Sequence, residues 1–351
     1  MSKMQQILTY LKNYDSKPVK LMEVCGTHTS AIAKSGIRSL LSPKIQLCSG
    51  PGCPVCVTPK AYIDKLCEYA EAPDTVVATF GDMIRVPGSQ LSLAEVKARG
   101  GKIEIFYSPF EMIQKAIDHK EITYIIAAVG FETTTPLYAL MIDQLIERGI
   151  TNIKFLTALK GMIPILEVLC TSEHTLDGFI APGHVSAIIG SDAYSLLASH
   201  FHKPFAVAGF SPEEVILSIY DLIKQIECDK HEVHNLYPEV VKPLGNLKAQ
   251  RLIEKYFKTA HTHWRGIGEV EGSGLYLRAE YKNFDADSQL SISEEKVPLD
   301  CKCQEVIRGR IQSSECKLFG TSCTPEHPVG PCMISGEGAC GIWFREGGKA
   351  C

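Results

Sequence analysis

The chain has 351 residues, a formal net charge of −4, and 45% hydrophobic and 22% charged residues. Its length suggests two or three domains rather than one core, and its charge balance argues against nucleic acid or an anionic membrane as a partner. Residues 1–18 lack the apolar core of a signal peptide, and no apolar run approaches the roughly 20 residues needed to cross a bilayer. We therefore expect a cytoplasmic protein with neither a nucleic-acid nor a membrane partner.

Residues 1–225 alternate short Val- and Ile-rich runs with helical patterns. Apolar runs that lack alternation are typical of strands buried on both faces of a parallel sheet. The expected strands are 19–24, 45–48, 75–80, 103–107, 124–129, 153–158, 178–180 and 205–208. Eight strands are more than one small sheet needs, so we predict an α/β fold with two consecutive parallel-sheet α/β domains.

Helices are expected between these strands, where capping residues mark their ends. The expected helices are 59–70 after Thr58, 136–148 before Gly149, and 212–226 after Ser211. The alternation stops near residue 228, beyond which we expect one helix, over 246–257, a glycine-rich stretch at 266–274 and an acidic segment at 285–295. The sequence therefore predicts an N-terminal helix (1–17) packing on the third domain, α/β domains over 18–120 and 121–228, and a small irregular and helical domain over 229–351, held by a metal centre.

The 14 cysteines are distributed unevenly. In a reducing cytosol, clustered cysteines more often bind metal or carry out redox chemistry than form structural disulfides. One group lies at 25, 48, 53 and 56, and another at 301, 303, 316, 323, 332, 340 and 351, whereas 67, 170 and 228 stand apart. We therefore expect two separate cysteine sites.

Cys25 is predicted to lie at the carboxyl end of a strand, before a helix that begins near Thr29. Ligand sites in open α/β sheets gather at such ends, and the positive end of a helix dipole favours a thiolate. His28 would be a nearby base or hydrogen-bond donor. The alternative is a buried strand-end cysteine without a chemical role.

Cys53 and Cys56 form a CxxC motif in a glycine-rich loop before another helix. Such a pair can form a disulfide or bind one metal, and its thiol pKa can fall to roughly 3.5–7.5. A structural zinc site would need a second close pair, which Cys25 and Cys48 do not form. We favour redox chemistry or transient metal binding, and interpret Cys48 as a core thiol.

Three more loops follow predicted strands, at 81–83, 130–136 and 181–190. Glu132 is a candidate acid, base or helix N-terminal carboxylate, and His184 is either a base, a ligand donor or a structural histidine. Asp82 is either an acceptor for a neighbouring loop or part of an Asx-turn. Their shared placement at strand ends favours one cleft.

Cys301, Cys316, Cys323 and Cys340 are spaced C-x14-C-x6-C-x16-C among glycines and prolines. Four thiolates from irregular chain suit a cubane iron–sulfur cluster or a structural zinc. Zinc sites usually contain tight pairs, and only the 301–303 pair approaches one, so we favour iron–sulfur. The residues considered as substitutes or weaker candidates are Cys303, Cys332, Cys351, which we expect to be exposed, and His327.

Taken together, these motifs resemble the HypD family of hydrogenase maturation proteins. The matching stretches are CGTHT at 25–29, GPGCPVCVTP at 50–59, GFETTTP at 130–136, APGHVS at 181–186 and the tail spacing. The resemblance implies two similar α/β domains and a third bearing a [4Fe–4S] cluster on Cys301, Cys316, Cys323 and Cys340. It also implies that Cys25 holds an iron shared with a cysteine of HypC, and that Cys53 and Cys56 are a redox-active dithiol.

The resemblance further implies a redox-active assembly scaffold rather than a conventional turnover enzyme. With HypC it would carry the iron on which Fe(CN)2CO is built, using cyanide from HypE that HypF made, and the product would pass through HypC to the hydrogenase large subunit. The cluster and the dithiol would supply electrons, and His28, Glu132 and His184 would orient ligands or shuttle protons. Two alternatives are a ferredoxin-linked thiol reductase that acts on a protein disulfide, and a zinc-stabilised binding protein.

Overall fold

The computed structural model describes residues 2–290 and 301–347, so Cys351 lies outside the described residues. The chain divides into two compact units, each made of separate segments. Unit 1 comprises Met1–Cys53, Ile165–Leu247 and Asp300–Cys351, and unit 2 comprises Pro54–Pro164 and Lys248–Leu299. Each unit is described by itself.

Unit 1 is built on a five-stranded parallel sheet in the order β2-β1-β7-β8-β9. Its strands are β1 (Val19–Glu23), β2 (Ile45–Ser49), β7 (Gly178–Pro182), β8 (Phe205–Ala208) and β9 (Val233–Asn235). Every residue of β7 and β8 is buried, as expected for strands covered on both faces. The first four of these strands confirm the predicted ranges to within two residues at either end.

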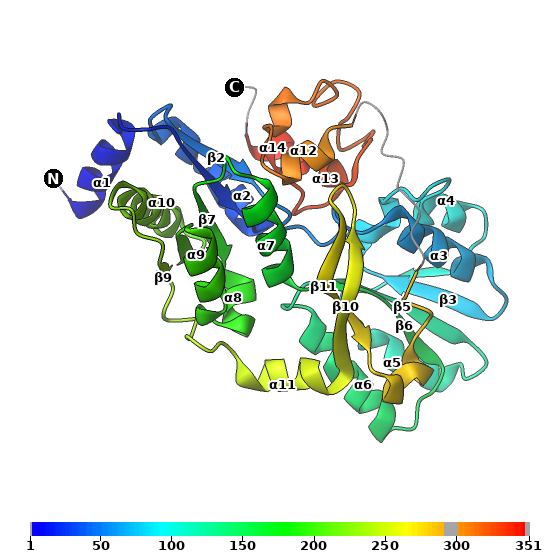
Figure 1. Ribbon diagram of the computed structural model, residues 1–351. Coiled ribbons are helices and arrows are strands. Elements are labelled where there is room, and N and C mark those ends of the chain that lie inside the picture. Colours follow the sequence, from blue (N-terminus) through cyan, green and yellow to red (C-terminus); the bar gives the residue numbers. More distant parts are fainter. Residues whose placement is uncertain (1, 291–300, 348–351) are drawn as a thin grey trace. The chain divides into compact units, whose positions relative to one another are not determined.

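Unit 1 also contains helices, several of which share a hydrophobic core with this sheet (Figure 1). They are α1 (Lys3–Lys12), α2 (Gly26–Lys34), α8 (Gly183–Ile189), α9 (Ser195–Phe201) and α10 (Pro212–Glu227), with short 3-10 turns at η1 (Ile37–Leu40) and η3 (Asp192–Tyr194). α7 (Met162–Ser172) begins in unit 2 and continues in unit 1. The packing partners of α1 are α10 and η1, through the buried Ile7 and Leu11, which corrects the prediction that this helix packs on a third domain.

Unit 2 is built on a six-stranded mixed sheet in the order β10-β11-β6-β5-β3-β4. Its strands are β3 (Thr75–Thr79), β4 (Ile103–Ile105), β5 (Thr123–Gly130), β6 (Ile153–Lys160), β10 (Phe257–Trp264) and β11 (Gly268–Leu277). Its helices are α3 (Lys60–Glu71), α4 (Leu93–Ala98), α5 (Glu111–Asp118), α6 (Thr135–Glu147) and α11 (Leu247–Tyr256), with 3-10 turns at η2 (Gly81–Arg85) and η4 (Ala279–Phe284). The α/β class is therefore confirmed.

The two sheets use the chain in an interleaved order rather than a consecutive one. Residues of β1 pair with β7, so that Leu21 lies beside Gly178, and β3 to β6 form the other sheet. The chain therefore does not divide at the expected domain boundaries, 120/121 and 228/229. It divides instead into the interleaved segments of units 1 and 2. Apolar runs predict that a segment is a strand, but they do not specify its partner, because neighbouring parallel strands present similar apolar side chains.

The glycine-rich stretch at 266–274, expected to be irregular, is part of a β-hairpin (Figure 1, yellow). Gly266 and Gly268 take positive φ values of 78° and 112° at its turn, which glycine adopts without the steric cost of a side chain. β11 then extends the sheet by pairing antiparallel to β6. The segment 229–351 is therefore not one domain, because its middle part belongs to unit 2 and its tail to unit 1.

The cysteine-rich tail forms short helices within unit 1, drawn in orange and red in Figure 1. They are α12 (Cys303–Ile307), η5 (Ser313–Glu315), α13 (Pro331–Ile334) and α14 (Ala339–Glu346). α14 contacts α2 and α13, and Arg310 pairs with the buried carboxylate of Glu173 at 2.9 Å. The tail is therefore anchored on the unit that carries Cys25.

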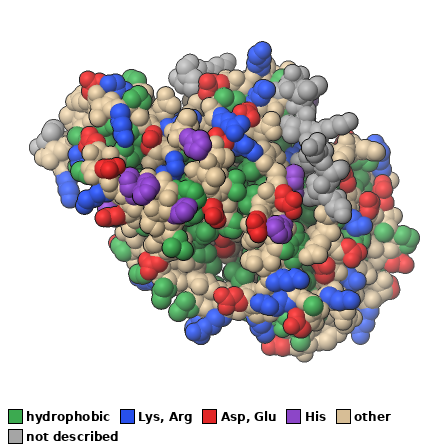
Figure 2. Space-filling model, viewed as in Figure 1, with side chains coloured by type: hydrophobic (Ala, Val, Ile, Leu, Met, Phe, Trp, Pro, Cys, Tyr) green, Lys and Arg blue, Asp and Glu red, His purple; other side chains and the backbone are tan. Residues whose placement is uncertain are grey.

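Figure 2 shows Lys and Arg side chains interspersed with Asp and Glu on the face drawn. Within the described residues, no helix combines the length and the apolar character that crossing a membrane requires.

Candidate functional site

Cys25 follows β1 and is the residue immediately before α2, which begins at Gly26 rather than near Thr29. Its backbone N–H donates to Oε2 of Glu23 at 3.0 Å, and the Thr29 hydroxyl donates to the other oxygen of that carboxyl. Glu23 is buried, so it ties the end of β1 to the first turn of α2. Sequence reasoning missed Glu23, whose only signal was an acidic residue at the carboxyl end of a predicted buried strand.

The thiol of Cys25 is partly exposed, yet its surroundings keep most water away. Burial raises the pKa of Cys25 to about 11, although the backbone N–H groups of His28 and Thr27 act in the opposite direction. At this thiol, desolvation outweighs the effect of the N–H groups at the helix N-terminus. A metal cation that binds here would have to displace the thiol proton.

Two glycines allow the loop that carries Cys53 to approach the loop that carries Cys25 closely. A Cβ at Gly52 would lie 2.5 Å from the backbone nitrogen of Cys25 and 2.6 Å from the carbonyl oxygen of Val24. A Cβ at Gly50 would lie 2.6 Å from a methyl group of Val24. Unit 1 therefore brings the residue before Cys53 into backbone contact with Cys25, which only glycine permits.

Cys53 and Cys56 are both buried and are joined as a disulfide. α3 begins four residues after Cys56, at Lys60, with Pro59 rather than Thr58 as the residue before its first turn. The Thr58 hydroxyl donates to the carbonyl oxygen of Pro54 at 2.9 Å and so closes the turn around the disulfide. The CxxC pair therefore lies, as a disulfide, within a tight turn.

His28 and His184 lie on the same aromatic ring in unit 1. Their ring centroids are 4.7 Å and 4.1 Å from that of Phe210. His28 Nε2 lies 2.8 Å from the carbonyl oxygen of Gly209, which makes that nitrogen the donor and leaves Nδ1 as an acceptor. Burial lowers the pKa of His28 to about 4 and also lowers that of His184, so both imidazoles are neutral at pH 7.

Glu132 lies in unit 2, two residues after the end of β5. One carboxyl oxygen accepts the Met162 N–H at 2.7 Å, and the other is buried without a hydrogen-bond partner among the described residues. Burial raises the pKa of Glu132 to about 7. This residue therefore has the properties of a proton donor or acceptor near neutral pH. The contacts that give it these properties all lie within unit 2. Asp82, in the same unit, is exposed at the start of η2.

Two of the tail cysteines, Cys301 and Cys303, lie beside Gly330 in unit 1. A Cβ at Gly330 would lie 2.5 Å from Sγ of Cys303 and 2.8 Å from Sγ of Cys301, and these two sulfurs are 3.4 Å apart. The Val329 N–H donates to Sγ of Cys323 at 3.4 Å. A glycine that clears space beside sulfurs and an N–H group directed at a sulfur both fit a protein-bound iron–sulfur cluster.

Cys332 and Cys340 lie near the same group of thiols. A hydrogen bond with Cys303 raises the pKa of Cys332, with further contributions from burial and from the thiols of Cys340 and Cys301. Cys316 is partly exposed, in a turn where its carbonyl accepts the Phe319 N–H at 2.9 Å. The structure therefore places Cys303 and Cys332, considered above as substitute ligands, beside Cys301 and Cys340. His327 lies in the intervening loop, where its N–H donates to Thr324.

Thiols alone do not specify the metal. Within residues 2–290 and 301–347, no three side chains of His, Cys, Asp or Glu are arranged to hold one metal ion. Ligands of a single tetrahedral zinc converge on one atom, whereas a cubane offers a separate iron to each of four thiolates. Thiols beside a glycine fit a cubane, and the choice between the two groups rests on the spacing of the cysteines in the sequence.

The tail also reaches the loop of Cys25. A Cβ at Gly26 would lie 2.6 Å from both Cβ and the carbonyl oxygen of Glu337. A Cβ at the following residue of the tail, Gly338, would lie 2.2 Å from the carbonyl oxygen of Cys332. One short segment of the tail therefore touches both cysteine sites of unit 1, an adjacency that the sequence did not predict.

Comparisons with known proteins give a consistent result. The family model described as "HypD: Hydrogenase formation hypA family" matches residues 2–347. The chain is 39% identical over 341 residues to hydrogenase maturation factor HypD of Escherichia coli (strain K12), covering 96% of this chain and 91% of that protein. It is 38% identical to hydrogenase maturation factor HypD of Rhodobacter capsulatus, covering 95% and 90%, and 40% identical to that of Rhizobium leguminosarum bv. viciae, covering 93% and 88%.

Proposed function

We propose a function from one premise: the chain belongs to the HypD family. It is a hydrogenase maturation factor, and together with HypC it forms the scaffold on which the Fe(CN)2CO unit is assembled. The observation that carries this proposal is the position of Cys25, which lies between the loop of Cys53 and the tail segment at Glu337. It acts as a redox-active scaffold rather than as an enzyme with conventional turnover.

Cys25 holds the iron that is the cargo of this assembly. A thiolate is a soft ligand, suited to low-spin iron that carries cyanide and carbon monoxide. The partial exposure of Cys25 supports this role, because a cysteine of HypC must reach the same iron. Glu23 fixes the backbone of Cys25 through its N–H and so fixes the direction of the thiol.

Cys53 and Cys56 act as the electron store beside that iron. Their disulfide takes up two electrons and two protons to become two thiols, and the reverse reaction returns both. The backbone contact between Gly52 and Cys25 supports this role, because it keeps the dithiol next to the iron-binding loop. HypE delivers the cyanide groups, which HypF makes, to the iron held by Cys25.

Cys301, Cys316, Cys323 and Cys340 are the residues that would hold a resident [4Fe–4S] cluster. When bound, such a cluster supplies single electrons. The Val329 N–H lies at the sulfur of Cys323, where it would stabilise the more reduced state. Burial of Cys301, Cys323 and Cys340 keeps their thiols from water and from oxidation.

The neutral histidines and Glu132 serve proton movements and ligand orientation. Nδ1 of His28 can accept a hydrogen bond, because its Nε2–H donates to the carbonyl oxygen of Gly209. His184 shares the Phe210 ring with it, and Glu132 titrates near neutral pH in unit 2. The finished unit passes through HypC to the hydrogenase large subunit in the cytoplasm.

The experiment that tests this proposal is iron counting after co-expression with HypC and anaerobic purification. We expect one iron beyond the cluster in the wild-type complex and loss of that iron alone in Cys25→Ser. Cys228→Ser, which changes an exposed cysteine, should retain it. A ferredoxin-linked thiol reductase, which the disulfide would also suit, holds no such iron and acts without HypC. An iron content equal to the cluster alone in the wild-type complex would favour that reductase.

A further inference from the structure

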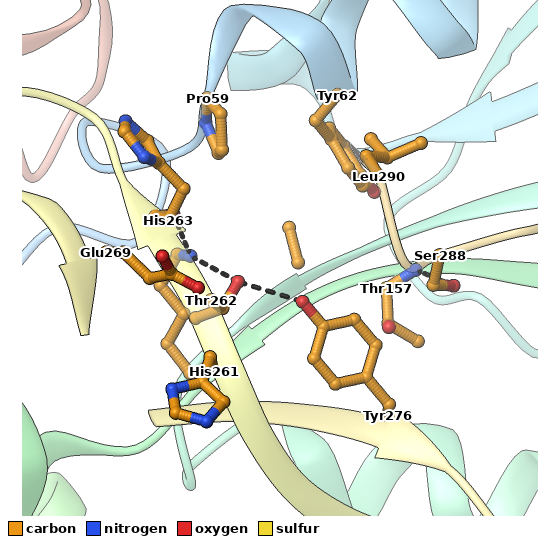
Figure 3. Close-up of a pocket in the computed structure, with 12 residues that line it drawn as sticks. Pro59, Tyr62, Thr157, His261, Thr262, His263, Glu269, Tyr276, Ser288 and Leu290 are labelled. Atoms are coloured by element: carbon orange, nitrogen blue, oxygen red, sulfur yellow. Dashed lines mark hydrogen bonds between the residues drawn. The ribbon is translucent and has the colours of Figure 1, made fainter. Parts of the chain in front are cut away.

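A buried hydroxyl group without a partner in the protein points to a water molecule or a ligand that accepts its proton, because an unsatisfied buried donor is costly. Within the part of the chain that the structure describes, Thr157 and Ser313 carry such hydroxyls. Thr157 lines a cavity of about 120 Å³ in unit 2 (Figure 3). Because a water molecule takes up roughly 30 Å³ of liquid, this cavity has room for water beside Thr157. Ser313 lies in different surroundings, in the cysteine-rich tail of unit 1.

Ser313 is the first residue of the short turn η5, which leads to Cys316. The side chain is 3% exposed, and its Oγ has no hydrogen-bond partner in the described ranges. The carbonyl oxygen of Ser313 accepts the Cys316 N–H at 3.2 Å, so the serine and the cysteine belong to one turn. The same turn contacts α14, whose first turn carries the buried Cys340. Ser313 therefore lies beside the segments that carry two of the four proposed cluster ligands.

Side-chain hydrogen bonds hold this turn in one conformation. The Gln312 N–H donates to Oε2 of Glu315 at 2.6 Å, and the Glu315 N–H donates in return to the Gln312 side chain. Nε2 of Gln312 also donates to the carbonyl oxygen of Leu47, in β2, at 3.0 Å. The turn is therefore tied to the sheet of unit 1. A fixed turn holds the Ser313 hydroxyl in one place, as a hydrogen-bond donor to a rigid cofactor requires.

We propose that the Ser313 hydroxyl donates a hydrogen bond to a sulfur of the [4Fe–4S] cluster and raises the reduction potential of the cluster. This inference rests on the proposed function, in which Cys316 and Cys340 are cluster ligands. The sulfurs of such a cluster carry negative charge and accept hydrogen bonds. Reduction adds a further negative charge, so a donated proton stabilises the reduced state more than the oxidised state. The Val329 N–H at the sulfur of Cys323 would act in the same direction.

The test is a redox titration of the anaerobically purified full chain, followed by the electron paramagnetic resonance signal of the reduced cluster. In Ser313→Ala we expect the equilibrium constant for one-electron reduction to fall about threefold to tenfold, because one hydrogen bond to the cluster is lost. A tenfold fall corresponds to a potential lower by about 59 mV. Ser314→Ala is the matched control, because Ser314 is the next residue of the same turn and is exposed. It should keep the wild-type potential.

Two further variants separate the hydroxyl from the shape of the side chain. Ser313→Thr keeps a hydroxyl and should stay close to the wild-type potential, whereas Ser313→Gly removes it and replaces Ser313→Ala if that variant does not hold the cluster. Equal potentials in the wild type and the variants without the hydroxyl, at undiminished visible absorption, would overturn this inference alone, as expected if a buried water satisfies Ser313. A wild-type protein without iron–sulfur absorption would overturn the cluster assignment and this inference together.

Discussion

Glu337 lies directly against Gly26, so that a Cβ at Gly26 would be 2.6 Å from both Cβ and the carbonyl oxygen of Glu337. This contact joins residues more than three hundred positions apart in the sequence. It brings the segment between Cys332 and Cys340 to the first turn of α2, which follows Cys25. The cysteine-rich tail and the proposed iron ligand therefore belong to one arrangement.

Gly26→Ala tests this contact. The new methyl group would overlap the backbone of Glu337, which cannot rotate away, and overpacking of this kind costs about 1–3 kcal/mol. We expect a lower melting temperature and a loss of hydrogenase maturation in cells. Gly81→Ala is the matched control, because the nearest atom to its Cβ would be 3.9 Å away. Equal maturation by the Gly26→Ala and Gly81→Ala variants would contradict the functional importance of the contact.

Cys323→Ser tests the proposed cluster. The sulfur of Cys323 receives the Val329 N–H, and a serine hydroxyl is a poor replacement for a soft thiolate ligand of iron. We expect the anaerobically purified variant to lose most of its visible absorption and its cluster iron. Cys228→Ser, at an exposed site, should keep both. A Cys323→Ser protein with the full wild-type spectrum would remove Cys323 from the ligand set.

The redox state of Cys53 and Cys56 can be read by alkylation and peptide mass spectrometry. Because the pair forms a disulfide, the peptide containing both should resist alkylation in oxidised protein and gain two alkyl groups after reduction. In Cys53→Ser, Cys56 should be alkylated without any reductant. Cys67→Ser should leave the behaviour of the pair unchanged. Full alkylation of both residues in oxidised wild-type protein would argue against a stable disulfide.

The pH dependence of stability should report on Glu132. Burial raises its pKa from 4.5 to about 7, so the folded state holds the proton more tightly than the unfolded state. Its stabilising contribution is complete below pH 4.5 and is lost as the pH rises through about 7. From linkage, this loss amounts to about 3 kcal/mol.

Glu132→Gln should therefore gain stability relative to the wild type by about this amount between pH 4.5 and pH 8. Urea unfolding of the full chain at several pH values measures the difference. The comparison cancels the similar behaviour of Glu23, whose pKa is also raised to about 7 by burial. A constant difference between the two proteins across this range would show that Glu132 does not titrate there.

Much of the fold could be predicted from the sequence. Strands such as 205–208 and helices such as 212–226 carry local signals, namely a short buried apolar run and the Ser211 capping residue. The partners of these strands could not be predicted, because pairing depends on contacts between distant segments. The hairpin of β10 and β11 was missed because its glycines, which are typical of loops, here form a turn and a sheet edge.

The candidate site could likewise be predicted only in part. The motifs identified Cys25, Cys53 and the tail cysteines, and unit 1 brings these loops together. The raised pKa of Cys25 could not be predicted, because it results from burial by segments far away in the sequence. The roles of Glu23 and Gly330 could not be predicted either, because each depends on a contact that forms only in the folded chain.

The central claim is that Cys25 holds the iron of the Fe(CN)2CO unit. Infrared spectroscopy of the anaerobically purified complex with HypC tests it most directly, because cyanide and carbonyl stretches absorb where protein groups do not. We predict these bands in the wild-type and Cys228→Ala complexes and none in Cys25→Ala. Undiminished cyanide and carbonyl bands in the Cys25→Ala complex would contradict the account.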